Sequence, residues 1–305
     1  MKSEFLIGTR GSKLALYQAE LVKAKLAQNF PLLRFTLLRI KTSGDMIRRS
    51  STDPFSTKRV YTQEIEDALL RKEVDAAVHS AKDLAVEMPE GLGMGAVLER
   101  EDPRDCLISR EGKKLNELPL GARVGTSSIR RRLQLLRLHP ELVVEDLRGN
   151  VDTRLRKLEE GALDALVLAY AGLKRLGLTN SVTEVFSEEK FYPAPGQGAI
   201  VVETRSGDSE VEELVKPLNH LESAFRVASE RAFLKRLEGG CELPCGVSTH
   251  LEGEEKKFVA RGILFSLDGR QSAEARLEAI PDDAESIGVR LAEEFGNEAQ
   301  QAIAH

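Results

Sequence analysis

The sequence has few of the features that mark specialised classes of protein. Three cysteines in 305 residues, with no tryptophan, do not make a disulfide framework, so we expect a reducing cytoplasm. The first residues turn acidic at once and lack the apolar core of a signal peptide. The most apolar run, residues 163–173, is too short to span a bilayer and contains Asp164. We therefore expect no membrane association.

An excess of charge of one sign is also lacking. The 44 basic residues are balanced by 49 acidic ones, which gives a net charge of −5, and 5% of the residues are aromatic. Without a helix-turn-helix pattern, this composition predicts no nucleic-acid partner. The glycines of residues 91–95 lead into a strand pattern and not into a helix, which argues against a phosphate-binding loop. Arginines that bind a ligand must therefore act locally.

Strand and helix patterns alternate along the first two thirds of the chain. Strand patterns lie at residues 4–9, 35–41, 76–78 and 93–98, and the alternation restarts at residues 122–125, 143–147 and 165–169. Two successive modules of similar size predict an α/β fold with two related lobes around a cleft. The strand pattern at residues 200–203 is a candidate to return to the first lobe.

The last third has a different pattern. A long helical stretch from residue 219 precedes three strand patterns and a final helix at residues 284–295, which predicts a small α+β domain. The charged residues 99–105 are interpreted as a break between domains. We expect three domains: residues 1–99 with 200–217, residues 100–199, and residues 218–305.

Arginine recurs where strands end and helices begin. Free backbone N–H groups at a helix start favour an anion, and arginine adds a planar fork for carboxylate or phosphate. Thr126 and Ser128 open one such helix, and if Ile129 faces the core, its three consecutive arginines cannot share one direction. The arginines placed in this way are Arg10, Arg130, Arg131, Arg148, Arg154 and Arg175.

Two further side chains could take part in chemistry. Asp83 follows Ser80 and Lys82 at a strand end, although such a carboxylate alone is more often a helix cap or an ion-pair partner. Cys241 follows two glycines and precedes a proline, so the loop can present its thiol as a nucleophile, although a lone cysteine is more often buried. A zinc site with Cys245 and His250 lacks a second pair of ligands, so we expect no metal.

Taken together, these segments resemble the hydroxymethylbilane synthase family, also called porphobilinogen deaminase. The resemblance covers nearly the whole chain, and the number and order of its motifs make it specific. The motifs are Gly8-Thr9-Arg10-Gly11-Ser12, His79-Ser80-Ala81-Lys82-Asp83, Arg100-Glu101-Asp102-Pro103-Arg104-Asp105, Gly125-Thr126-Ser127-Ser128-Ile129-Arg130-Arg131, Leu147-Arg148-Gly149-Asn150, Gly172-Leu173-Lys174-Arg175, Pro195-Gly196-Gln197-Gly198 and Leu237-Glu238-Gly239-Gly240-Cys241.

The resemblance implies a cytoplasmic, monomeric transferase of porphyrin and haem biosynthesis, in which the two α/β lobes are periplasmic-binding-protein-like. Such an enzyme joins four porphobilinogen molecules head to tail, releases ammonia and gives the linear tetrapyrrole hydroxymethylbilane. It implies a dipyrromethane cofactor held by a thioether to Cys241, and it gives Asp83 the catalytic role. The positions implied to hold the cofactor are Ser80, Lys82, Thr126, Ser128, Arg130, Arg131 and Arg148, and those implied to bind substrate are Arg10, Ser12, Gln18, Arg148, Arg154, Arg175 and Gln197.

Three departures from the family pattern leave alternatives open. The lid at residues 55–61 keeps Lys58 but has no glycine, Ala85 replaces a common proline, and Cys245 adds a second thiol near Cys241. One alternative is therefore a family member impaired by its lid. Another is a two-lobed binding protein for acidic small molecules, which would need neither Cys241 nor Asp83.

Overall fold

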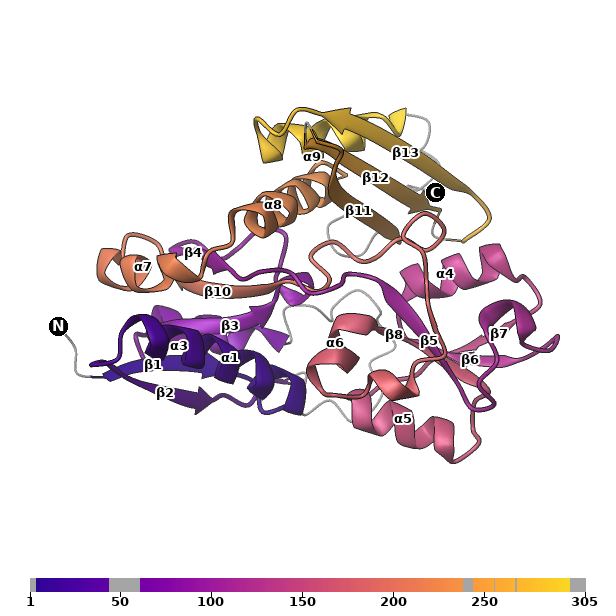
Figure 1. Cartoon of the computed structure of the whole chain (residues 1–305), viewed down its shortest axis with the longest axis horizontal. Helices are drawn as coiled ribbons and strands as arrows, with labels where there is room; N and C mark the ends of the chain where they lie inside the picture. The colour runs from indigo at the N-terminus through magenta and orange to yellow at the C-terminus, as the bar shows by residue number, and fades with distance from the viewer. Residues whose placement is uncertain (1–3, 44–60, 238–243, 255, 267, 297–305) are drawn as a thin grey trace.

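The computed structural model describes residues 4–43, 61–237, 244–254, 256–266 and 268–296. Three separate sheets organise these residues, and Figure 1 shows α8 between β10 and the C-terminal sheet. Within the described residues, no helix is long and apolar enough to cross a membrane. Of the lid predicted at residues 55–61, residues 55–60 with Lys58 lie outside the described residues, as does Cys241.

The first sheet has five strands in the order β2-β1-β3-β10-β4. β1 runs parallel to β2 and β3, whereas β10 runs antiparallel to β3 and β4. α1 and α7 pack on one face of the sheet and α3 on the other. The bounds are β1 Glu4–Thr9, α1 Lys13–Asn29, β2 Arg34–Arg39, α3 Gln63–Leu70, β3 Ala76–Ser80, β4 Leu92–Val97, β10 Ile200–Arg205 and α7 Ser209–Val215.

The second sheet repeats this arrangement with the order β7-β6-β8-β5-β9. β5 takes the place that β10 takes in the first sheet, because each lies fourth in the order and runs antiparallel to both neighbours. α4 covers one face of the sheet, and α5 and α6 cover the other. The bounds are β5 Asp105–Ser109, β6 Arg123–Gly125, α4 Ile129–Leu138, β7 Val143–Glu145, α5 Val151–Glu159, β8 Ala165–Ala169, α6 Tyr170–Arg175 and β9 Glu184–Val185.

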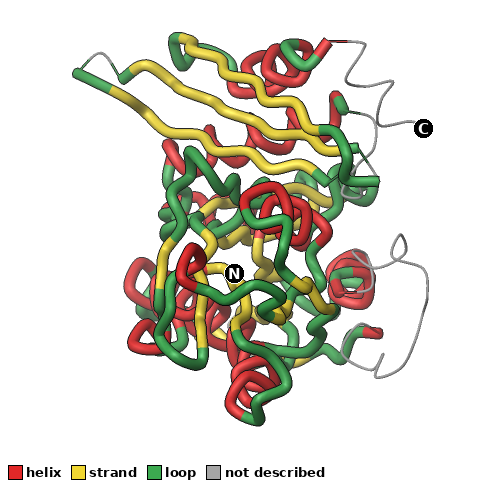
Figure 2. The backbone as a smooth tube through the Cα atoms, turned by 90° about the vertical axis from the view of Figure 1, so that its right-hand side faces the viewer, coloured by secondary structure: helices red, strands yellow, loops and turns green. Residues whose placement is uncertain are grey.

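The C-terminal sheet has three antiparallel strands, which lie side by side at the top of Figure 2. α8 and α9 pack together on one face of this sheet and enclose a core that includes Phe233, Phe258 and Ile287. The bounds are α8 Leu221–Arg236, β11 Cys245–Glu252, β12 Lys257–Phe265, β13 Ser272–Ala279 and α9 Ala284–Glu293. Single turns of 3₁₀-helix occur at η2 Ala81–Asp83, η3 Leu115–Glu117, η4 Thr179–Ser181 and η5 Lys216–Leu218.

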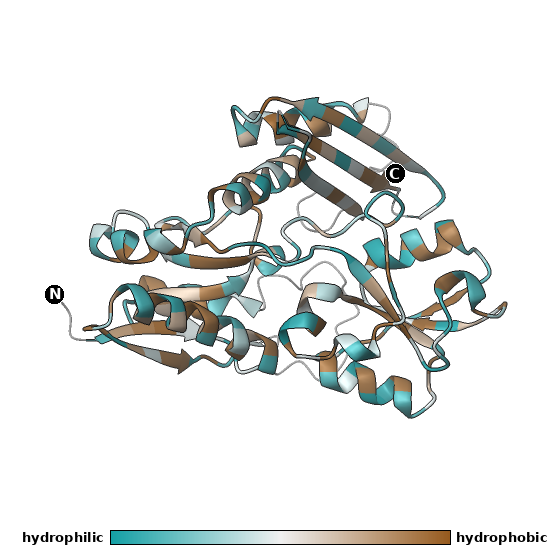
Figure 3. Cartoon of the chain, viewed as in Figure 1, coloured by the Kyte–Doolittle hydropathy of each residue, from teal (hydrophilic) through white to brown (hydrophobic). Residues whose placement is uncertain are grey.

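The predicted fold class, two α/β lobes and a small α+β domain, is confirmed. Apolar residues, brown in Figure 3, concentrate in the strands, while the helices alternate between brown and teal. This pattern is expected when helices cover both faces of a sheet. The strand predicted at residues 200–203 does return to the first sheet, as β10.

Two residues have surroundings that the sequence interpretation did not give. Residues 99–105 were interpreted as a charged break between domains, and the last of them, Asp105, begins strand β5 and is fully buried. The apolar residues after it make β5 a buried strand, and two arginines neutralise its charge. Ile129, considered as a core residue, is 44% exposed, whereas Arg130 and Arg131 point inward.

Candidate active site

The end of β3 carries the first group of predicted site residues. β3 ends at Ser80, and the single turn of η2 then places Lys82 and Asp83 at the edge of the first sheet. Gln18, buried on α1, donates its side-chain amide to Ser80 Oγ at 2.9 Å. Ligands of open α/β sheets bind at this edge, where parallel strands end. Residues from α1 and β3 therefore meet at one place.

A cavity of about 50 Å³ opens at this edge. Arg10, Ser12, Gln18, Ser80 and Asp83, which were all predicted as site residues, contribute to its lining. Ser12 also caps α1, because its Oγ accepts a hydrogen bond from the backbone N–H of residue 15 at 3.3 Å. The structure therefore brings these five predicted residues together.

Tyr61 lies beside Arg10 and was missed as a site residue. The guanidinium carbon of Arg10 lies 4.3 Å from the centroid of the Tyr61 ring, which is a cation–π contact. Tyr61 and Thr62 also line the cavity. Tyr61 is the last residue of the segment interpreted as a lid, so its position next to a predicted loop was the available signal.

The second lobe contributes the start of α4. Ser128 caps this helix: its Oγ accepts a hydrogen bond from the backbone N–H of Arg131 at 3.4 Å. The Ser128 N–H in turn donates to Thr126 Oγ1 at 3.2 Å. Arg130 and Arg131 are 5% and 6% exposed, because the first turn of α4 faces β5. The capped helix start therefore sets the direction of both arginines.

Asp105 holds these two arginines in place and was also missed. Its carboxylate oxygens lie 2.7 Å from Arg130 Nη1 and 2.7 Å from Arg131 Nη2. Burial alone would raise the pKa of Asp105, but the positive charges of Arg130 and Arg131 outweigh it and hold the pKa at about 2. A carboxylate directly before an apolar run was the signal in the sequence.

Gln197 links the two groups of residues. Its fully buried side chain donates to Asp105 Oδ1 at 2.9 Å and to the carbonyl of residue 103 at 2.7 Å. Its Oε1 lies 3.3 Å from Lys82 Nζ and 3.4 Å from Arg131 Nη2. One amide group thus joins Lys82, from the first lobe, to Arg131, from the second.

Two glycines allow the Gln197 loop to take this position. Gly196 and Gly198 have φ values of +73° and +86°, which side chains with a Cβ rarely adopt. A Cβ on Gly198 would overlap the carbonyl oxygen of Glu101, and a Cβ on Gly196 would lie 3.0 Å from the backbone nitrogen of Lys82. The loop can approach η2 this closely because both positions are glycine.

The cations of the site lower one another's proton affinity. Burial, with the nearby charge of Arg131, lowers the pKa of Lys82 to about 8. The Lys82 side chain keeps intermediate exposure, so water offsets part of this effect. Burial and the charge of Arg131 also lower the pKa of Arg154 to about 10, and burial lowers the pKa of Arg130 and Arg175. Positive charge thus exceeds what Asp105 neutralises.

The remaining predicted arginines differ in their surroundings. Arg175, half-buried, donates to the carbonyl of Gly198 at 2.6 Å, and Arg154 donates to the carbonyl of Gly149 at 2.7 Å. Arg148 is exposed and pairs with Asp146 at 3.0 Å. The pair with Asp146 therefore does not connect Arg148 with the cluster around Asp105.

The arrangement of β11 argues against the zinc alternative. Cys245 and His250 are five positions apart on this strand, so their side chains point to opposite faces of the sheet. Cys245 is 4% exposed and packs into the core beneath α8 and α9. Among the described residues, no group of three metal-ligating side chains occurs.

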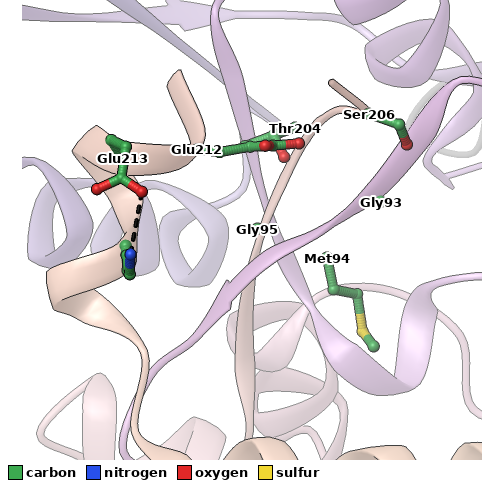
Figure 4. A pocket seen from close by; sticks show the side chains of 8 residues that line it. Gly93, Met94, Gly95, Thr204, Ser206, Glu212 and Glu213 are labelled. Carbon is green, nitrogen blue, oxygen red and sulfur yellow. Dashed lines mark hydrogen bonds and ion pairs between the residues drawn. The ribbon is translucent and has the colours of Figure 1, made fainter. Parts of the chain in front are cut away.

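A larger hollow lies elsewhere and involves none of the predicted site residues. It measures about 260 Å³ and is formed by β4, β10 and the region of α7 (Figure 4). Glu213 and Lys216 pair at its rim at 3.0 Å and are about 70% exposed. We therefore place the site at the smaller cavity, where the polar side chains converge.

Comparison with known proteins identifies the family. Residues 5–213 match the model of the porphobilinogen deaminase dipyromethane cofactor binding domain, and residues 224–297 match that of the porphobilinogen deaminase C-terminal domain. The chain belongs to the porphobilinogen deaminase family. It therefore has the family's dipyrromethane-binding domain, and the family consists of enzymes acting on pyrrole substrates.

Relatives of this family match over nearly the full length. The porphobilinogen deaminase of Pelotomaculum thermopropionicum is 50% identical over 97% of this chain and 94% of its own length. The porphobilinogen deaminase of Carboxydothermus hydrogenoformans is 45% identical over 99% of this chain and 97% of its own length. Among solved structures, the methionine-binding protein MetQ matches with a TM-score of 0.47 at 14% identity, over 75% of this chain and 95% of that one.

The described residues fit a cofactor with several carboxylates. Lys82, Arg130 and Arg131 surround one buried carboxylate, and Arg154 lies close enough for Arg131 to lower its pKa. Added carboxylates would offset this excess of positive charge, and an arginine can bind one through two hydrogen bonds where its N–H groups are not already used, as those of Arg131 are on Asp105 and on the carbonyl of residue 167. The donor set therefore suits acetate and propionate groups.

Proposed function

We propose that this chain is a hydroxymethylbilane synthase, a transferase that joins four porphobilinogen molecules head to tail and releases ammonia. The observation that carries the proposal is the cluster of Lys82 and Arg131 on Gln197 and of Arg130 and Arg131 on Asp105, together with the cavity that Asp83 lines. This cluster suits a growing chain of rings that each bear two carboxylates. The family match supports this proposal and neither a binding protein nor an impaired enzyme.

We assign different tasks to the two sides of the site. Lys82, Ser80, Thr126, Ser128, Arg130, Arg131 and Arg148 are proposed to hold the cofactor. When bound, the dipyrromethane supplies the terminal ring to which the substrate is joined. Arg10, Ser12, Gln18, Arg148, Arg154 and Arg175 are proposed to bind substrate carboxylates. Gln197 uses its side-chain amide on protein partners, so we propose that it positions Lys82 and Arg131.

Asp83 is proposed as the catalytic residue. It lies at the cavity beside Lys82, and its negative charge contributes to the proton affinity of that lysine. A carboxylate at this place stabilises positive charge that develops on a substrate pyrrole and can accept a proton from it. The neighbouring cations hold the substrate carboxylates, which orients the ring toward Asp83.

We further propose that Cys241 anchors the cofactor by a thioether, while Cys245 stays unmodified. The test is the intact mass of the wild-type chain, expressed where porphobilinogen is available, beside Cys241→Ser and Cys245→Ala variants. We expect a dipyrrole adduct on the wild type and on Cys245→Ala, and none on Cys241→Ser. An unmodified wild-type chain would contradict the enzyme assignment, and an adduct on Cys241→Ser would contradict the anchor.

The remaining assignments are proposals as well. We propose a monomer that works in the cytoplasm, with domains at residues 1–99 with 200–217, 100–199 and 218–305. The three sheets support this division, because each falls within one of these units. Lys58 is proposed to belong to an active-site lid. Sedimentation of the purified holoenzyme tests the monomer, and a dimer at working concentration would contradict it.

A further inference from the structure

One side of α8 faces the segment that follows Asp83. Val227, Arg231 and Lys235 are each four residues apart, so they form one stripe along the helix. This stripe contacts residues 84–87, which begin directly after Asp83 at the end of η2. A helix of the C-terminal unit thus lies against the segment that leads away from the catalytic residue.

Each member of the stripe contacts the segment in a different way. Leu84 is buried in the same apolar cluster as Val227. Arg231 Nη2 donates to the carbonyl of Ala85 at 2.7 Å and to the carbonyl of Val86 at 2.8 Å. Lys235 Nζ lies 3.7 Å from a carboxylate oxygen of Glu87. The hydrogen bonds of Arg231, the middle residue of the stripe, are therefore shorter than the ion pair of Lys235 with Glu87.

The Arg231 side chain is placed to bind the backbone of residues 84–87 and not their side chains. Its Nη2 carries two hydrogens, and each can point at one of two successive carbonyls. Charge-assisted hydrogen bonds of this kind are shorter and stronger than neutral ones. Val86 also packs against the core of the C-terminal domain, so the segment is held through a side chain as well as through its backbone. Its backbone is thereby fixed two residues beyond Asp83.

We propose that Arg231 is a positioning residue that keeps Asp83 in its working position by fixing the backbone of Ala85 and Val86 to α8. This inference rests on the proposed catalytic role of Asp83. A shift of about 1 Å in a reacting group can cost on the order of a hundredfold in rate. Among the described residues that line the cavity, none is Arg231, Ala85 or Val86, so we expect the loss of Arg231 to affect turnover more than substrate binding.

The test compares Arg231→Gln with Arg236→Gln in the holoenzyme. Arg236 lies on the same helix but pairs with Glu293 of α9, so it is a matched control. For Arg231→Gln we expect at least a tenfold fall in kcat, a KM within twofold of the wild type and an unchanged cofactor adduct by intact mass. We also expect faster amide hydrogen exchange across residues 84–87. A kcat within twofold of Arg236→Gln would overturn the proposal.

A second variant tests whether rigidity is what Arg231 supplies. Leu84 has φ −71° and ψ 142°, a conformation that a following proline favours, so Ala85→Pro can stiffen the segment. In the Arg231→Gln background, we expect Ala85→Pro to recover at least threefold in kcat, and an unchanged kcat would overturn the proposal. If Arg231→Gln does not fold, Arg231→Lys is judged by the same criteria.

Asp83→Asn, measured in the same assay, separates this inference from the function on which it rests. Normal turnover by Asp83→Asn would remove the catalytic role of Asp83 and the basis of the inference with it. An inactive Asp83→Asn beside a fully active Arg231→Gln would leave the proposed function intact and overturn the inference alone.

Discussion

The two lobes use the same strand-to-helix turn in different ways. In the first lobe, Ser12 caps α1 and Arg10 stands before the cap, stacked on Tyr61 beside the cavity. In the second lobe, Ser128 caps α4 and two arginines follow the cap, each paired with the buried Asp105. The first lobe thus has its arginine at a cavity wall, and the second has its arginines fixed by a buried carboxylate.

This difference indicates a division of labour between the lobes. A buried ion pair costs a large desolvation energy, and its geometry is specific, so the second lobe offers a preformed site for a permanent group. An arginine at a cavity wall suits a ligand that arrives and leaves. We connect the start of α4 with the cofactor and the start of α1 with the incoming substrate. The five predictions that follow test this division, in order of falling effect.

The largest effect should come from removing the buried carboxylate. Asp105→Asn leaves Arg130 and Arg131 as uncompensated buried charges, so the free energy of unfolding should fall by about 3–5 kcal/mol. Denaturant unfolding measures this. Asp146→Asn, which removes the partner of the exposed Arg148, should cost less than about 1 kcal/mol. Equal losses in the two variants would contradict the contrast between buried and exposed pairs.

The next effect concerns the loop that joins the lobes. Gly198→Ala places a Cβ against the carbonyl oxygen of Glu101 at a positive φ, whereas Gly121→Ala has a positive φ with open space around it. The backbone conformation costs about 1–2 kcal/mol in both variants. Overlap should add about 1–3 kcal/mol in Gly198→Ala alone. Denaturant unfolding of the pair measures the difference, and no difference would mean that the loop can shift away from Glu101.

A smaller effect should appear in the pH dependence of kcat/KM. Because burial and Arg131 lower the pKa of Lys82 to about 8, its positive charge is lost as the pH rises through that value. We expect kcat/KM to fall about tenfold for each pH unit above about 8. Lys82→Gln should be slower at pH 7, and its profile should lack this alkaline fall. A fall that persists in Lys82→Gln would assign it to another group.

The same lysine links pH to stability. The folded chain loses the Lys82 proton at about pH 8, whereas the unfolded chain keeps it up to the ordinary pKa of 10.5. The unfolded chain therefore binds more protons between these values. The free energy of unfolding should rise across this window, relative to Lys82→Gln. Thermal unfolding of the wild type and of Lys82→Gln at pH 7.5 and pH 10 checks whether stability rises with pH in this way.

The smallest effect should come from Arg10→Lys. Lysine keeps the charge but loses the planar fork and much of the contact with Tyr61, so we expect KM for porphobilinogen to rise about fivefold. The free energy of unfolding should stay within about 0.5 kcal/mol of the wild type. Arg130→Lys is the counterpart in the second lobe. It should lower the free energy of unfolding by more than about 0.5 kcal/mol and raise KM for porphobilinogen by less than about fivefold. The opposite outcome would reverse the proposed division.

The sequence predicts local features of this fold well. Ser128 was expected at the start of a helix, and its side chain accepts the capping hydrogen bond there, as that of Ser12 does at the start of α1. The strands were found from short apolar runs, because burial on both faces leaves that pattern. β5 was missed, since its first residue is charged and its neutralising partners lie about 25 residues further along the chain.

Features that depend on distant contacts could not be predicted from the residues. Nothing near Gln197 shows that its amide reaches Lys82, 115 positions away, and nothing near Arg231 shows its contact with Ala85. Arg10 and Asp83 were placed correctly at strand ends, but the shared cavity follows from the strand order of the first sheet. The roles of Cys241 and Lys58 stay predictions, because both lie outside the described residues.

The position of β10 has a consequence for how this chain folds as it is made. β10 lies between β3 and β4, yet it is synthesised about a hundred residues after β4. At roughly 5–20 residues per second, a ribosome needs on the order of ten seconds to supply it. Until then β3 and β4 would present unpaired backbone edges, which are prone to pairing with other chains. In the second sheet, β5 takes the place that β10 takes in the first, and it is synthesised before the other strands of its sheet. The lobe that is translated second can therefore complete its sheet first.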